Sequence, residues 1–229
     1  MTQAFSEQSF RGKALICAAL VFSVSLLVYC WTLAPTVTLV DSGELIVTAR
    51  FFGVAHPPGF PLYLTLAHLF SLIPIGSIAF RINFASAFFA ALASGLLTLV
   101  TAEFIASTCY LTETNVKKGK KRLTRAGVKD DGEGKSGWMF NIFPAAASGL
   151  VLAFSRTLWS YATIAEVYTL NTLLIVTILF LMTRWRRRIL EDPRWIAKQG
   201  KSGKPTILIM TRHFMRRRSH SDSRSAFIM

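Results

Sequence analysis

Two carboxylates, Asp41 and Glu44, stand three residues apart in the run Asp-Ser-Gly-Glu and form the first candidate site. If a helix begins at Ser42, side chains at this spacing share one helical face. The alternative is structural: Asp41 caps that helix by accepting backbone N–H bonds, and Glu44 faces water. The pair directly follows an apolar segment long enough to cross a membrane, where a lipid-linked substrate would present its head group. This position favours a functional site.

A second acidic residue, Glu166, lies at the start of another apolar segment, two residues before Tyr168. An ionisable side chain at the mouth of a membrane span is costly and is a functional candidate, although it could equally be an interface carboxylate that reaches water. Basic side chains on the same side could neutralise a phosphate, pair with the carboxylates or anchor the chain at the interface. They are Arg50, His56, Arg81 and Arg156.

Four apolar blocks must position these residues. A helix rises about 1.5 Å per residue, so about 20 apolar residues cross a bilayer core of about 30 Å. The first block ends in Tyr29, Cys30 and Trp31, an aromatic belt that favours an uncleaved anchor over a cleaved signal peptide. We therefore predict an all-α polytopic membrane protein with about four transmembrane helices. The predicted spans are residues 14–34, 82–104, 138–155 and 167–184.

Basic residues set the predicted orientation. Residues 111–137 hold eight Lys or Arg, whereas residues 35–80 hold only Arg50. The positive-inside rule places residues 1–13, the loop 111–137 and a basic, unstructured tail over 186–229 in the cytosol. Residues 35–81 and the turn 156–166 then face the other side. A net charge of +14 is explained by this topology and does not require a nucleic-acid partner.

The outer segment 35–81 is predicted to contain two interfacial helices. Residues 42–52 can form an amphipathic helix, and the run His56-Pro-Pro-Gly59 interrupts the chain. Residues 61–73 are apolar but too few to span a bilayer, so we expect them to lie along the membrane surface. Small residues at Ala87, Ala91 and Gly95, and over 145–149, favour close packing between spans.

Several motifs in this order resemble one known family. They are Asp41-Ser-Gly-Glu44, Gly53-Val-Ala-His56-Pro-Pro-Gly59-Phe-Pro61-Leu-Tyr63, Phe80-Arg81-Ile-Asn83, and Ala165-Glu166-Val-Tyr168-Thr-Leu-Asn171. The chain over about residues 14–185 resembles the amino-terminal region of the transmembrane protein 260 family of protein O-mannosyltransferases, long catalogued as domain of unknown function 2723.

This resemblance implies a GT-C fold and a reaction in the membrane of the endoplasmic reticulum. Mannose would pass from a polyprenyl-phosphate carrier to a protein Ser or Thr hydroxyl on the lumenal side, with no further cofactor or metal. Asp41 corresponds to the expected catalytic base, with Glu44 beside it. A carboxylate base would help because a hydroxyl is a poor nucleophile. The leaving phosphate needs donors, a role open to Arg81, Arg50 or His56. Glu166 and Tyr168 complete the candidate substrate-binding residues.

Members of this family are expected to continue through further spans, so the chain resembles a shortened form. The alternative function is a non-catalytic membrane isoform, or a fragment that binds a partner of such an enzyme. A small transporter is disfavoured because neither inverted repeats nor mid-membrane ionisable residues are evident.

Overall fold

The computed structural model describes residues 2–38, 41–124 and 138–191, which form seven helices and no strand. The predicted all-α fold class is confirmed. Of the predicted cytosolic segments, residues 125–137 and 192–229 lie outside the described residues. The helices are α1 (Thr2–Trp31), α2 (Ser42–Phe51), α3 (Pro61–Ser71), α4 (Ile78–Thr124), α5 (Trp138–Ala153), α6 (Arg156–Ala162) and α7 (Tyr168–Glu191). Among the described residues, those up to Arg184 form one compact unit, which contains every candidate site residue.

Three helical segments are long and apolar enough to cross a membrane: Phe10–Trp31, Ile78–Thr108 and Tyr168–Ile189. A fourth span is formed if Ile142–Ala153 and Arg156–Ala162 are counted together, although these helices meet at a bend of 60°. The prediction of about four spans is therefore confirmed for the described residues. Ser155 explains the bend, because its backbone is extended and its hydroxyl accepts a hydrogen bond from the Leu158 N–H at 3.4 Å, which starts α6 afresh.

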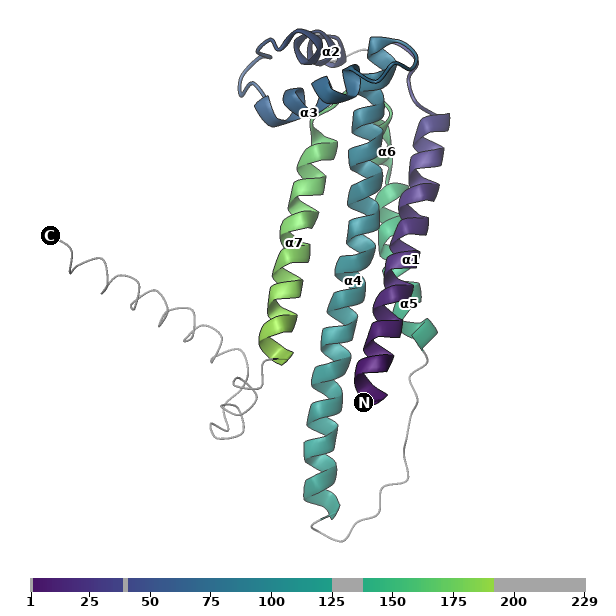
Figure 1. The fold of residues 1–229 in the computed structure, drawn as a ribbon, viewed down its shortest axis with the longest axis vertical. Coiled ribbons are helices and arrows are strands. Elements are labelled where there is room, and N and C mark those ends of the chain that lie inside the picture. Colours follow the sequence, from purple (N-terminus) through teal and green to yellow (C-terminus); the bar gives the residue numbers. More distant parts are fainter. Residues whose placement is uncertain (1, 39–40, 125–137, 192–229) are drawn as a thin grey trace, which may run out of the picture. The chain divides into compact units, whose positions relative to one another are not determined.

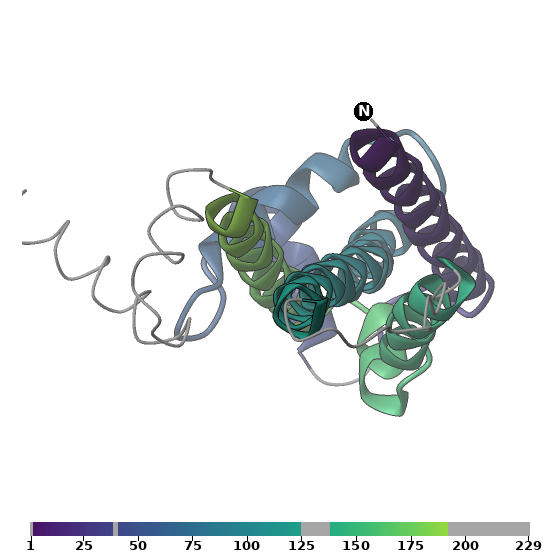
Figure 2. The same ribbon diagram turned by 90° about the horizontal axis from the view of Figure 1, so that it is seen from below.

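Helices α1, α4 and α5 contact one another (Figure 2). Small residues lie along this seam. A Cβ atom added at Gly149 of α5 would collide with Thr98 Oγ1 of α4 and lie 2.7 Å from the Ser94 carbonyl oxygen. A Cβ atom at Gly95 would lie 3.0 Å from the Ala18 carbonyl oxygen of α1. The helix backbones approach closely because these positions carry no side chain, as predicted for the small-residue faces.

Helices α2 and α3 lie crosswise at one end of the upright helices (Figure 1). Phe52 ends α2 in the left-handed conformation, and Phe60 adopts the same conformation just before Pro61 opens α3. Their inward faces share one core with α4 and the start of α7. This core includes Leu45, Ile46, Ala49, Tyr63, Leu64, Ile82, Ala85 and Leu170.

The segment between α1 and α2 is anchored at this same end. Asn83 of α4 donates from Nδ2 to the carbonyl oxygens of Ala34 at 2.8 Å and Thr36 at 3.2 Å. The Ala34 N–H donates to the Thr163 carbonyl oxygen at 2.9 Å. These bonds join the two outer segments, one leading to Asp41 and the other to Glu166.

Candidate active site

Asp41 occupies the position before α2, but its carboxylate does not cap the helix. The Leu45 N–H donates to the Asp41 backbone oxygen at 3.0 Å, which starts the helix. The Asp41 side chain makes no capping hydrogen bond and is 54% exposed. Asp41 thus stands at the expected start of the helix, but the capping bond of the structural alternative is absent. The carboxylate therefore remains accessible for another role.

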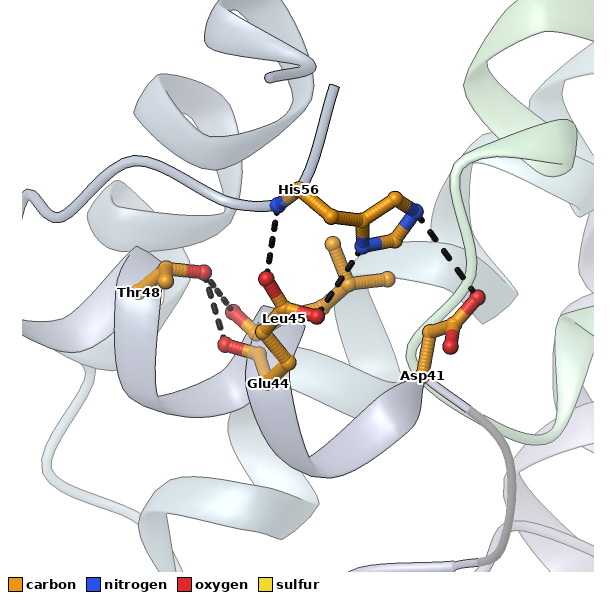
Figure 3. Close-up of polar contacts among 5 residues, drawn as sticks. All are labelled: Asp41, Glu44, Leu45, Thr48 and His56. Atoms are coloured by element: carbon orange, nitrogen blue, oxygen red, sulfur yellow. Dashed lines mark hydrogen bonds and ion pairs between the residues drawn. The ribbon is translucent and has the colours of Figure 1, made fainter. Parts of the chain in front are cut away.

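Glu44 is turned toward His56, the residue that begins the His-Pro-Pro-Gly run (Figure 3). Its Oε1 accepts the backbone N–H of His56 at 2.7 Å, and its Oε2 lies 2.9 Å from His56 Nδ1. Both carboxylate oxygens thus contact one residue, twelve positions along the chain. The hydrogen bond lowers the pKa of Glu44, and the same bond raises the pKa of His56.

His56 also faces Asp41. Its Nε2 lies 4.0 Å from Asp41 Oδ2 (Figure 3). The charge of Asp41 adds in a smaller way to the raised pKa of His56. The structure therefore brings three of the predicted residues together at the start of α2, with the imidazole between the two carboxylates.

Glu166 is buried, with 5% of its surface exposed. Its backbone is fixed by Ser86, whose Oγ accepts the Glu166 N–H at 3.1 Å and donates to its carbonyl oxygen at 3.3 Å. Tyr63 OH lies 2.9 Å from the same Oγ. Burial raises the pKa of the Glu166 carboxyl, and the negative charge of Asp41 raises it further. Sequence reasoning missed Ser86 and Tyr63, although a serine inside an apolar span was a signal for Ser86.

Two of the predicted phosphate-binding cations have other partners. Arg81 donates to the carbonyl oxygens of Ser71, Ile75 and Gly76, each at 2.9 Å, so that its guanidinium holds the turn after α3. Arg50 donates to Ser71 Oγ at 3.5 Å. Both side chains stabilise the junction of α2, α3 and α4, and no described contact joins either of them to the carboxylates.

Tyr168 opens α7 and is 52% exposed. Its ring packs against Tyr161 of α6, with ring centroids 4.8 Å apart and planes inclined by 34°. The two tyrosines lie on either side of Glu166 in the sequence, so their ring contact joins the end of α6 to the start of α7.

Comparison with known proteins identifies the family of this chain. The model described as the protein O-mannosyl-transferase TMEM260 N-terminal domain matches residues 41–211. The chain belongs to this family. The match begins at Asp41 and includes every candidate residue of the site.

Two curated relatives carry the same family name. The chain is 31% identical to protein O-mannosyl-transferase tmem260 of Dictyostelium discoideum over 189 residues, which is 81% of this chain and 19% of the relative. It is 31% identical to protein O-mannosyl-transferase TMEM260 of Mus musculus over 181 residues, which is 77% of this chain and 20% of the relative. The chain thus spans about a fifth of the length of these relatives. No solved structure matches it.

Proposed function

We propose that this chain carries the base and part of the substrate site of a protein O-mannosyltransferase of the GT-C type. The reaction would move mannose from a polyprenyl-phosphate carrier to a Ser or Thr hydroxyl of an acceptor protein, in the membrane of the endoplasmic reticulum. The two relatives to which the chain is 31% identical are named protein O-mannosyl-transferases, which supports this reaction.

The observation that carries the proposal is the half-exposed carboxylate of Asp41. It stands at the start of α2 without capping the helix, and it faces His56, which also contacts Glu44. A hydroxyl that approaches Asp41 can donate its hydrogen bond to the carboxylate. The carboxylate then takes the proton while the oxygen bonds to the sugar carbon and the carrier phosphate leaves with the bonding electron pair. This single displacement inverts the configuration of the sugar.

The surroundings of the site favour a lipid-linked donor. Helix α3 exposes Leu62 at 50% and Leu69 at 56%, although it does not span the membrane. A helix with an apolar exposed face beside membrane spans suits the membrane interface. A carrier anchored in the bilayer would then present its phosphate and sugar at the depth of Asp41 and Glu44.

The test compares the wild-type chain with Asp41→Asn in liposomes that contain polyprenyl-phosphate mannose and a Ser/Thr peptide. Removal of a general base should lower transfer by about 10²–10⁴-fold, while membrane insertion and thermal unfolding stay unchanged because the carboxylate makes no capping bond. Absence of transfer by the wild-type chain would overturn the activity proposed for it. Full transfer by Asp41→Asn would overturn the role of Asp41.

A further inference from the structure

Glu44 uses both of its carboxylate oxygens to fix a single residue. One oxygen holds the His56 backbone N–H and the other faces Nδ1 of its ring (Figure 3). Since the bound Glu44 carboxylate is an acceptor only, Nδ1 carries the proton in this contact. The second ring nitrogen, Nε2, is then presented away from Glu44.

The imidazole is also restrained by its neighbours. The edge of the Phe60 ring packs against it, with centroids 5.6 Å apart and planes inclined by 77°. The Gly59 N–H donates to the His56 carbonyl oxygen at 2.8 Å, which closes the turn that carries the ring. Nε2 therefore has a defined direction, toward Asp41 Oδ2 at 4.0 Å.

We infer that Glu44 is a positioning residue that acts through His56, and that Asp41 and His56 Nε2 together hold the acceptor hydroxyl. This inference rests on the proposed function. The gap of 4.0 Å between Asp41 Oδ2 and His56 Nε2 can be bridged by one hydroxyl oxygen at about 2.8 Å from both atoms. The hydroxyl donates its hydrogen to Asp41 and accepts the Nε2–H of the His56 imidazolium, in which both ring nitrogens carry a proton. Asp41 receives the hydroxyl proton, and the Nδ1–H of His56 stays with Glu44 throughout.

The alternative is that Glu44 is a second base that acts independently of His56. The two roles differ in how substitutions combine. If Glu44 acts only through the imidazole, then replacing Glu44 should not lower the rate of mannose transfer any further in a variant that already lacks the imidazole. If Glu44 acts independently, the two losses multiply.

The decisive experiment measures mannose transfer by Glu44→Gln, His56→Asn and the double variant in the same liposomes. Loss of an outer hydrogen-bonding partner of a functional histidine is expected to lower transfer about 10–100-fold. The double variant should be no slower than His56→Asn alone. A double variant slowed by the product of the two single effects would overturn the inference.

A titration that needs no transfer activity provides the second readout. The His56 imidazole is followed by NMR in the full chain, with its resonance assigned by its loss in His56→Asn. Glu44→Gln should lower the pKa of His56, because the hydrogen bond that the His56 ring donates to Glu44 is the largest cause of its elevation. The resonances of His68, whose Nδ1 lies 2.9 Å from the Ala49 carbonyl oxygen, serve as the reference for an intact fold in each variant. An unchanged His56 titration in Glu44→Gln would overturn the inference even if the chain transfers no sugar.

Failure of the proposed function has a different signature. If Asp41→Asn keeps full transfer while Glu44→Gln still shifts the His56 titration, the base assignment is wrong. In that outcome the contact between Glu44 and His56 is supported, but the proposal that His56 and Asp41 together hold the acceptor hydroxyl is overturned.

Discussion

The outer layer of α2 and α3 and the seam of α1, α4 and α5 are stabilised in different ways. In the seam, the hydroxyls of Ser94 and Thr98 beside the small residues turn back onto their own helix, to the carbonyl oxygens of Ala90 at 3.0 Å and Ser94 at 3.2 Å. A directed contact between helices is added where Tyr29 OH of α1 donates to the Ala153 carbonyl oxygen of α5 at 2.7 Å. The outer layer is held by contacts that carboxylate and guanidinium groups make to the chain between helices, as between Glu44 and His56 and between Arg81 at the start of α4 and the end of α3. The seam thus depends on close backbone packing with hydroxyl contacts, whereas the outer layer depends on contacts of charged side chains.

We therefore expect the seam to determine mainly the stability of the fold and the outer layer to determine mainly the chemistry of the site. The buried seam should respond to changes in side-chain volume. The outer layer carries the half-exposed carboxylates and the histidine, so it should respond to changes in charge and hydrogen bonding. Three substitutions test this division.

The largest effect is expected for Gly149→Val in the seam. The new side chain would meet Thr98 Oγ1 and the Ser94 carbonyl oxygen, so the helices must separate. Overpacking of this kind costs about 1–3 kcal/mol. The loss should appear as a lower midpoint in detergent unfolding of the purified chain. The matched control is Gly12→Val in α1, where nothing lies within 4 Å of an added Cβ atom, and it should leave the midpoint unchanged.

A smaller effect is expected for Arg81→Gln in the outer layer. The variant loses charge-assisted hydrogen bonds to three carbonyl oxygens at the end of α3. Because the site is partly exposed to water, we expect a loss of about 1–2 kcal/mol. Faster hydrogen exchange confined to residues 61–77 would reveal the loosened turn. Arg156→Gln, at the exposed start of α6, is the control. Equal effects of the two variants would contradict the specific role of Arg81.

The smallest effect concerns the pH dependence of Glu166. Its pKa is raised in the folded chain, so the folded state holds this proton more tightly than the unfolded state. The contribution of Glu166 to stability is therefore favourable at low pH and is lost as pH rises through the folded pKa. Glu166→Gln should remove this decline, measured as the unfolding midpoint at a series of pH values from the ordinary glutamate pKa of about 4.3 upward. An unaltered pH profile would contradict the effect of burial.

The sequence was sufficient for the elements of the outer layer but not for their contacts. The predicted interfacial helices over 42–52 and 61–73 correspond to α2 and α3, because apolar periodicity and prolines are local signals. The contact between Glu44 and His56 depends on how the chain reverses between the two helices, which no local pattern specifies. The sequence leaves two roles open for His56, neutralising a phosphate or pairing with the carboxylates, and the structure places it against Glu44 and Asp41.

The third predicted span also differs in detail from the structure. Hydropathy predicts one span over residues 138–155, whereas α5 ends at Ala153 and α6 begins at Arg156. Hydropathy alone does not register a bend, but Ser155 is a preferred N-cap residue and could have indicated one. The roles of the individual site residues stay predictions. They depend on how a substrate binds, which the residues alone do not specify.

The anchoring of the segment after α1 has a consequence for biosynthesis. Thr32 accepts a hydrogen bond from Trp159 Nε1 at 3.1 Å, and these residues are 127 positions apart. A ribosome that adds about 5–20 residues per second needs on the order of ten seconds to make that stretch. During this interval Asp41 and His56 already exist, while Thr163 and Glu166, which complete their surroundings, do not. The surroundings of the carboxylate site are thus completed late in synthesis, because the segment that contains Trp159, Thr163 and Glu166 is made after Asp41 and His56.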